Sequence, residues 1–483
     1  MLKVFYRNHQ TKIFSFILML ASACLFLPGC AQKIIPPTSS QATMPLAFPT
    51  AEGFGKYTTG GRGGKVFIVS NLADDGEGSL RKAVTAKGPR IVVFSVSGTI
   101  HLLSPLSIKS DITIAGHTAP GDGICLADYP VSLGGNNIII RYLRFRMGDK
   151  NQNGGMVDKA GADDAFGGVR RNNIVIDHCS MSWSTDEVCS IYAGDSTSVQ
   201  WNIISEPLNY SYHFETGDKD FERHGFGAIW GGKHASFHHN LFAHCNSRTP
   251  RFDGIRNSPV ENVDYRNNVI YNWGGNNVYA GEGGNYNIVN NYYKAGPSTS
   301  PSAKYNVANP YKREDIPFGK FYIQGNYVDG SSEVTADNWL GVKMNNGTKE
   351  DAARSKLSSP FATEEKATQT ASDAYNAVLK MAGASFRRDT LDERIINDAK
   401  NRTGKLIDVQ GNYPHGTPYE KTVTAWPSLK SLPALIDSDK DGMPDEWEKK
   451  HGLNANDITD ASAYKLHQQY SNIEIYINSL VGE

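Results

Sequence analysis

The sequence carries almost no net charge. Its 483 residues contain 49 Lys and Arg against 50 Asp and Glu, which gives a formal net charge of -1. No global field would draw such a chain to a nucleic acid, so we expect no nucleic-acid partner. Any anionic ligand must instead be held by a local cluster of basic side chains.

Cysteine is also scarce. Of the six cysteines, Cys24 lies within an apolar N-terminal run and Cys30 directly after it. The other four are Cys125, Cys179, Cys189 and Cys245. Their spacing does not match that of metal ligands. In an oxidising compartment four thiols permit three disulfide connectivities, whereas buried unpaired thiols inside a β core are the alternative.

Long apolar runs are limited to residues 1–30, which resemble an export signal. Basic residues precede the run "IFSFILMLASACLFL", which ends at Leu27-Pro28-Gly29-Cys30. The run is short for a membrane span, and Leu-x-Gly-Cys resembles a bacterial lipoprotein signal. This predicts a secreted outer-membrane lipoprotein with a lipid on Cys30 and a flexible tether over residues 31–46. An ordinary secretory peptide is the alternative, because Pro28 is unusual at its position.

Helical periodicity is almost absent between Val66 and Gly330, and two-residue hairpin turns are scarce there. Many short apolar segments separated by Gly, Asn and Asp fill this stretch instead, which predicts a succession of β-strands. The scarcity of hairpin turns argues against an antiparallel sandwich.

Five of these segments share a pattern in which an asparagine lies between two apolar stretches. The shared residues are Asn202, Asn240, Asn268, Asn291 and Asn326, at separations of 38, 28, 23 and 35 residues. A period near about 23 residues with insertions indicates a coil repeated along an axis. We therefore predict an all-β domain over residues 47–330, a right-handed parallel β-helix. One asparagine per coil should bond to its counterparts in the coils above and below.

The composition changes after Gly330. The segments "TASDAYNAVLKMAGAS" and "LDERIINDAKNRTG" have apolar residues at helical spacing, and Gly404 is the expected stop of the second helix. We predict a helical extension over residues 331–425 that packs against the β-helix or caps its end. An open coil end would otherwise expose unpaired strand edges.

The last segment, residues 426–483, contains a predicted calcium loop. In "DSDKDGMPDEWE" acidic residues fall at positions one, three, five, nine and twelve of an EF-hand-type loop, with Gly442 at position six. The acidic residues are Asp437, Asp439, Asp441, Asp445 and Glu448. Pro444 replaces the usual apolar residue at position eight, so we expect a single loop that braces the tail. A solvated acidic turn is the alternative.

Four stretches in the predicted β-helix resemble one enzyme family. They are "AEGFGKYTTGGRGG", "GSLRKAV", "GADDAFGGVRRNNIVIDHCSMSWSTDE" and "ASFHHNLFAHCNSRTPR". Together they resemble the pectate lyases of polysaccharide lyase family one, in the form found on bacterial lipoproteins. The resemblance implies that polygalacturonate or a related acidic polysaccharide is cleaved by calcium-assisted β-elimination. We expect the enzyme to be a monomer.

The resemblance implies roles for the two arginines around Pro250. It makes Arg248 the base that removes the proton from the fifth ring carbon, next to a carboxylate whose charge calcium and cationic side chains neutralise. Because arginine ordinarily stays protonated, a purely electrostatic role is the alternative. Arg251 is interpreted as a clamp on a substrate carboxylate. The family often has another arginine where this chain has Asp253.

The resemblance also implies the catalytic calcium ligands. Asp164 and Asp186 match two of the family carboxylates, but the third position is Ser190. We interpret the adjacent Glu187 as its substitute, because calcium accepts oxygen donors in flexible geometry.

A lysine expected from the family is missing. Asn209 stands at its position, and a long insertion follows. Lys219, Arg223, Lys233 or His224 could supply the missing cation. We select His224 as the substrate-binding residue, because the neighbouring glycines let a substrate approach the backbone. The pair Asp177 and His178 looks catalytic, but the resemblance implies a structural role.

Two other functions remain open at this stage. A polygalacturonase-like hydrolase is suggested by Ala162-Asp163-Asp164 and His224-Gly225, and it would need paired carboxylates that flank the bond. A pectin-binding surface solenoid without turnover is suggested by the incomplete ligand and lysine sets.

Overall fold

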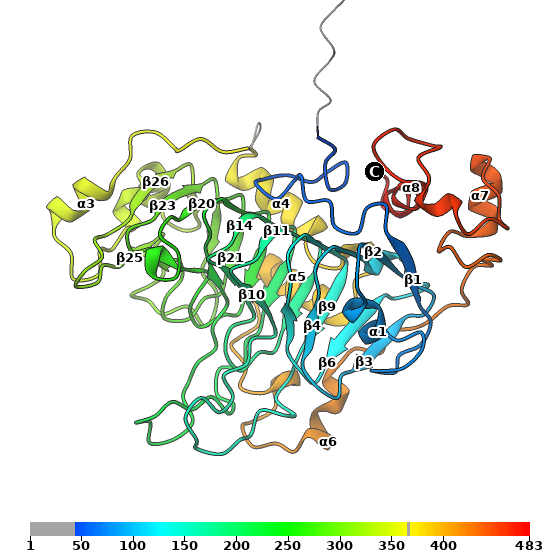
Figure 1. The fold of residues 1–483 in the computed structure, drawn as a ribbon. Coiled ribbons are helices and arrows are strands. Elements are labelled where there is room, and N and C mark those ends of the chain that lie inside the picture. Colours follow the sequence, from blue (N-terminus) through cyan, green and yellow to red (C-terminus); the bar gives the residue numbers. More distant parts are fainter. Residues whose placement is uncertain (1–43, 365–367) are drawn as a thin grey trace, which may run out of the picture. The chain divides into compact units, whose positions relative to one another are not determined.

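The short apolar segments form three parallel sheets in the computed structural model, which describes residues 44–364 and 368–483. In that part of the chain the sheets, named A, B and C, have ten, nine and eight strands. Each coil passes from sheet A to B to C and returns to A beside its previous strand, as β14 does beside β11. Such parallel crossovers are right-handed in nearly all proteins. The fold is the predicted right-handed parallel β-helix (Figure 1).

The strands are short, as the turn-rich sequence predicts. Sheet A contains β1 (Lys65–Val69), β2 (Arg90–Phe94), β5 (Ile112–Ala115), β8 (Ile138–Arg141), β11 (Asn172–Asp177), β14 (Asp195–Gln200), β17 (Ala235–His238), β20 (Asn262–Arg266), β23 (Asn285–Val289) and β26 (Lys320–Gln324). Sheet B contains β3 (Gly98–His101), β6 (Ile124–Ala127), β9 (Leu143–Arg146), β12 (Ser180–Ser182), β15 (Ile203–Ser205), β18 (Leu241–Ala243), β21 (Val269–Tyr271), β24 (Tyr292–Lys294) and β27 (Tyr327–Val328). Sheet C contains β4 (Leu106–Ile108), β7 (Val131–Leu133), β10 (Phe166–Val169), β13 (Cys189–Tyr192), β16 (Ile229–Trp230), β19 (Arg251–Phe252), β22 (Tyr279–Ala280) and β25 (Asn309–Pro310).

In the described part of the chain one α-helix lies between β1 and β2, and the others follow the last strand. The α-helices are α1 (Leu80–Thr85), α2 (Ser332–Ala336), α3 (Lys349–Ser355), α4 (Ala371–Met381), α5 (Thr390–Asn401), α6 (Tyr419–Thr422), α7 (Asp445–His451) and α8 (Asn472–Ser479). Short 3-10 turns are η1 (Gly116–Thr118), η2 (Gly254–Arg256), η3 (Asn338–Gly341), η4 (Ser385–Arg387), η5 (Gln410–Asn412), η6 (Val423–Ala425) and η7 (Asp460–Ser462). None of the described helices is both long and apolar enough to cross a membrane. The predicted lipidation site Cys30 lies outside the described residues.

Alternation along each strand decides what enters the core. On β11 Ile174 and Ile176 point into the central apolar core, whereas Val175 faces outward and packs under Phe48 of the N-terminal segment. The period of two that a strand imposes thus buries one apolar set inside the coil and leaves the other for covering segments. The four cysteines at positions 125, 179, 189 and 245 are buried and free, as the unpaired-thiol alternative predicted.

The predicted asparagine ladder is present and fully buried. The backbone N–H of each ladder residue donates to the side-chain oxygen of the asparagine one coil further on, at 2.9 to 3.0 Å from Asn202 to Asn291. The ladder extends beyond the prediction, because the backbone N–H of Asn326 donates to Oδ1 of Asn338 on η3 at 2.9 Å. These hydrogen bonds satisfy the backbone polar groups that are buried at this corner of the coil. Apolar side chains could not pair with these groups.

The helical extension packs on the outer face of sheet B. Val378 and Ala382 of the α4 region and Ile395 of α5 form one buried cluster with Ile203 and Leu241 of that sheet. Of the two alternatives, these helices thus have the first arrangement, in which they lie against the coil. The predicted stop at Gly404 is wrong by two residues: α5 ends at Asn401, and its cap is Arg402, whose φ of 61° is left-handed.

The asparagine ladder leads to a first prediction, about the free energy of unfolding. In Asn268→Ala the buried Asn240 N–H and side-chain amide lose their acceptor, and bonds from Asn268 to Phe237 and Asn291 disappear. We expect a loss of about 2 to 4 kcal/mol in the free energy of unfolding, because buried donors are left unpaired. Urea unfolding measures this loss. The control is Asn401→Ala at the exposed end of α5, and equal midpoints for the two variants would contradict the assigned role of the ladder.

Candidate active site

The predicted catalytic residues come from successive coils and meet on the sheet C side. Asp164 lies just before β10, Asp186 and Glu187 before β13, and Arg248 before β19. Bridges of the parallel type join Glu187 to Phe226 and Phe226 to Ser247. Because stacked strands lie about 4.8 Å apart, residues at matching positions of these coils form a row.

Three carboxylates form a candidate metal centre in this row. Oxygens of Asp164, Asp186 and Glu187 lie within 4.8 Å of one another, and Asp164 Oδ1 accepts a 3.0 Å bond from the Glu187 N–H. Burial and the negative charge of Asp186 raise the pKa of Asp164 well above its usual range. Crowded carboxylates of this kind are the hard oxygen donors that calcium takes in proteins. The structure thus brings the three predicted ligands together.

His224 belongs to the same cluster, but in a different role from the predicted one. It is buried, its Nε2 lies 2.7 Å from Asp186 Oδ1, and its Nδ1 lies 3.4 Å from Glu222 Oε2. Burial lowers the pKa of His224, but the hydrogen bonds to these two carboxylates outweigh burial and raise the pKa above its usual value. The ring also stacks on His213 at 3.9 Å. Both nitrogens face protein carboxylates, so the imidazole orients Asp186 and is not available to a substrate.

Arg248 lies against the carboxylates. Its guanidinium contacts the Glu187 carboxylate, covers the Phe226 ring at 4.2 Å and donates from Nε to the Tyr279 hydroxyl at 3.2 Å. The residue has a φ of 59°, an uncommon conformation that is often found at functional sites. Three neighbours therefore fix the position of the arginine that the sequence selects.

Arg251 does not have the arrangement expected of a substrate clamp. Its side chain is 8% exposed, Nη2 donates to Glu282 at 3.2 Å, and Nη1 donates to the backbone oxygen of Phe252 at 2.8 Å. The prediction is not supported, because the guanidinium is committed to the protein. Glu282 lies on the next coil, so no local pattern around Arg251 indicates this partner.

Two other arginines that the sequence did not single out lie close by. Arg256 on η2 is 29% exposed and lies 3.6 Å from Asp253, while Arg313 is 48% exposed and lies 3.3 Å from Glu282. The only local signal is the position of Arg256 three residues after Asp253. Arg313 is brought here by the stacking of coils, which sequence spacing does not reveal.

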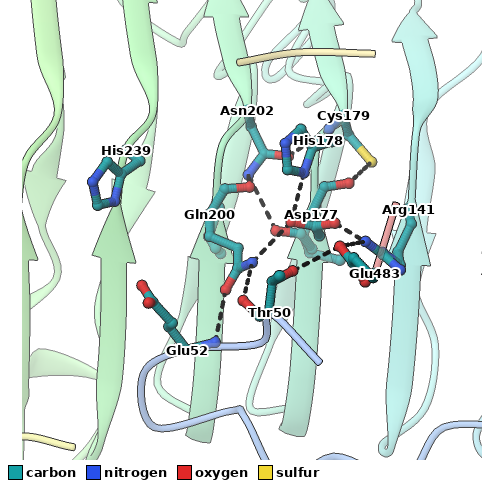
Figure 2. Close-up of polar contacts among 12 residues, drawn as sticks. Thr50, Glu52, Arg141, Asp177, His178, Cys179, Gln200, Asn202, His239 and Glu483 are labelled. Atoms are coloured by element: carbon teal, nitrogen blue, oxygen red, sulfur yellow. Dashed lines mark hydrogen bonds and ion pairs between the residues drawn. The ribbon is translucent and has the colours of Figure 1, made fainter. Parts of the chain in front are cut away.

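Asp177 and His178 are structural, as the sequence analysis expected. Asp177 lies on sheet A and accepts 2.8 Å bonds from Arg141, His178 and Gln200 (Figure 2). Burial raises the pKa of Asp177, but the charges and hydrogen bonds of His178 and Arg141 outweigh burial and hold this pKa below its usual range. The site row lies beside sheet C, so this pair is not part of it.

The C-terminal acidic loop forms a second candidate metal centre. Oxygens of Asp437, Asp439 and Asp441 lie within 4.8 Å of one another, and Glu448 reaches the same distance from Asp441. Burial and the charge of Asp439 raise the pKa of Asp441 to about 8. The predicted ligand Asp445 does not join this cluster. It accepts 2.8 Å bonds from the Ser438 N–H and hydroxyl instead.

The contrast between Arg251 and Arg256 gives a second prediction. Arg251→Ala leaves the buried Glu282 without its main partner, so we expect unfolding to cost about 3 kcal/mol less than in the unchanged protein. Arg256→Ala removes an exposed side chain and should change the same free energy by less than about 0.5 kcal/mol. Urea unfolding of both variants tests this, and similar losses in the two would show that Arg251 is not structural.

Comparison with known proteins supports a family assignment. No protein-family model matches the chain. The probable pectate lyase C of Aspergillus fumigatus is 36% identical over 459 residues, which cover 92% of this chain and 96% of that protein. The corresponding protein of Emericella nidulans is 34% identical over 455 residues, with the same coverage.

Solved structures are more distant. A pectate lyase bound to a hexasaccharide shares 14% identity over 72% of this chain and 99% of its own, with a TM-score of 0.48. Such a likeness is too weak to align single site residues. Both sequence relatives are fungal, so they do not support the bacterial lipoprotein form. Their identity over nearly the whole length nevertheless decides the family: the chain belongs to the pectate lyases.

Proposed function

We propose that the protein cleaves polygalacturonate or a related pectic polysaccharide by β-elimination. The observation that carries this proposal is the contact between Arg248 and a cluster of three carboxylates, all presented by successive coils. Elimination from a uronate needs a group at the proton of the fifth carbon and positive charge at the neighbouring carboxylate. Arg248 is the group placed to act on the proton, and the three carboxylates form the site for a cation that supplies the positive charge.

Calcium is the cation that we propose for this cluster. Asp164, Asp186 and Glu187 would hold it, since all three offer carboxylate oxygens and their crowding raises the pKa of Asp164. When bound, calcium supplies the positive charge that neutralises the uronate carboxylate and makes the adjacent proton more acidic.

Arg248 is proposed as the group that takes this proton. The C–H electrons then form the double bond between the fourth and fifth carbons, and the glycosidic oxygen leaves with its bonding pair and is protonated by water. In accepting the proton, the neutral guanidine of Arg248 becomes a guanidinium that pairs with the Glu187 carboxylate.

Arg256 and Arg313 are proposed as the groups that bind substrate carboxylates. Both are partly exposed and lie beside Asp253 and Glu282, on the same side of the coil as Arg251. A guanidinium matches a carboxylate through two parallel hydrogen bonds, which suits an acidic chain of sugars. They take the role that Arg251 cannot fill.

The two alternatives lack comparable support. A hydrolase would use Asp163, but this carboxylate accepts a 2.9 Å bond from Gln152, and His224 faces Asp186. Hydrolysis also needs two carboxylates on opposite sides of the bond. A binding protein without turnover would not require Arg248 in contact with a metal cluster.

One assay separates the three functions. We expect polygalacturonate to yield products that absorb in the ultraviolet, because elimination creates a conjugated double bond, and we expect a calcium chelator to prevent this. Reducing ends without absorbance would indicate a hydrolase, and neither signal would indicate a binding protein.

The same assay tests Arg248. In Arg248→Ala we expect the rate to fall by at least about 10² to 10⁴-fold, the usual contribution of a proton-transfer group. Arg171→Ala is the matched control, since Arg171 is an arginine beside sheet C that donates to the Leu133 backbone oxygen at 2.9 Å, at the opposite end of β10 from Asp164. Unchanged turnover in Arg248→Ala with an intact fold would rule out this assignment.

The location of the enzyme rests on the sequence alone. We propose that residues 1–30 direct secretion, and that a lipid on Cys30 anchors the protein to the outer membrane. The molecular mass of the mature N-terminal peptide tests the anchor: a diacylated Cys30 is expected, and an unmodified residue at any other cleavage site would exclude it. The monomeric state also stays a prediction.

A further inference from the structure

The acidic loop of the C-terminal segment buries carboxylate oxygens that have no partner. Glu448 is 0% exposed and Asp441 is 1% exposed. Both oxygens of Glu448 and one oxygen each of Asp441 and Asp439 are buried and accept no hydrogen bond from the residues that the structure describes. Burial of ionised carboxylates without partners is strongly unfavourable, and a bound cation would offset this cost.

A further carboxylate comes from outside the loop. Asp460 on η7 has an oxygen within 4.8 Å of oxygens of Asp441 and Glu448. Its Oδ1 is buried and unpartnered, whereas Oδ2 accepts a 3.0 Å bond from the Asn454 N–H. The side chain is therefore fixed by one oxygen and offers the other to the cluster. Asp460 supplies the carboxylate that Asp445, bonded to Ser438, does not.

The loop backbone holds the other ligands in place before any ion binds. Asp437 accepts bonds from the N–H groups of Lys440 and Gly442 at 2.8 and 3.0 Å, and Asp441 accepts one from Met443 at 2.8 Å. Gly442 has a φ of 95°, which other residues rarely adopt. A preorganised loop loses little conformational entropy on binding, which favours the bound state.

This cluster sits where the C-terminal segment meets the first coils. Met443 and Ile473 pack against Ile91 and Val93 of β2 in one buried cluster, and a Cβ on Gly442 would lie 2.8 Å from Val66 of β1. In Figure 1 α8 accordingly lies near β1 and β2, and α7 lies farther out. The same segment is joined to the coil by the ion pair of Arg62 with Glu474 at 2.8 Å.

We propose that a calcium ion bound by Asp437, Asp439, Asp441, Glu448 and Asp460 fastens the C-terminal segment to the first coils of the β-helix. The ligands are all carboxylates, and the Met443 carbonyl at position seven of the loop is the further oxygen that such loops use. The ion connects the acidic loop before α7 with η7 after it. Its removal therefore frees the C-terminal segment from β1 and β2. The site is separate from the carboxylates beside Arg248 and does not depend on the proposed reaction.

The test uses the full mature chain and calcium alone. Bound calcium is measured by equilibrium dialysis and the midpoint of thermal unfolding is recorded with calcium and with chelator. We expect calcium to raise the midpoint of the unchanged protein, because it binds the folded state. Asp186→Asn, which alters only the cluster beside Arg248, should keep this rise.

Glu448→Gln and Asp460→Asn should each weaken calcium binding at this site by at least about tenfold and remove most of the rise in the midpoint. Glu446→Gln, an exposed residue of the same helix, is the matched control and should behave as the unchanged protein. If Glu448→Gln fails to fold, Asp439→Asn, which is only half-buried, replaces it.

Two results would overturn the proposal. With each variant made in the Asp186→Asn background, a calcium-dependent rise that persists in both Glu448→Gln and Asp460→Asn excludes the site, and one that persists only in Asp460→Asn excludes the ligand from outside the loop. Limited proteolysis gives an independent readout: chelation should expose the segment after residue 430 to cleavage in the unchanged protein, and equal resistance with and without calcium contradicts the fastening role. Loss of lyase activity in Asp186→Asn bears only on the proposed function.

Discussion

The whole molecule depends on the register between successive coils. A single coil has no partner for its backbone groups and cannot bury its apolar face, so each becomes stable only against its neighbours. The ladder from Asn202 to Asn338 fixes this register, because each asparagine accepts from one coil and donates to the other side. A shift of one residue would turn the ladder outward and the inner isoleucines with it.

The same register assembles the site. Asp164, Glu187 and Arg248 are far apart in sequence, yet each stands at the entry to a strand of sheet C and is thereby placed in one row. The insertion before β16 adds His224 and Phe226 to this row and supplies a buried partner for Asp186 and a surface for Arg248. Residues of the coils fix the positions, while the loops supply the variable neighbours.

The features that could be predicted from the sequence are those that repeat along the chain or lie within a short motif. The asparagine pattern predicted the fold and its ladder, and the Arg-x-Pro turn and the acidic residues predicted which side chains gather. Sequence reasoning could not predict the partners that arrive from another coil, such as Glu282 for Arg251 or Asp186 for His224. Burial then decides the role: an exposed Arg251 would have been a plausible clamp, whereas the buried one is a structural ion pair. Asp460 escaped notice for the same reason, because it lies twelve residues after Glu448 and outside the loop pattern.

The position of Asn338 explains how the array of coils stops. Asn338 belongs to the turn η3 and not to a strand, so the last acceptor of the ladder is presented by a segment that has no open β edge of its own. On the neighbouring side the Leu357 N–H after α3 donates to the Phe321 carbonyl of β26 at 2.9 Å and covers part of that edge. Both segments lie where a second molecule would otherwise add a strand to the stack. Covering this end of the coil disfavours end-to-end association into fibres.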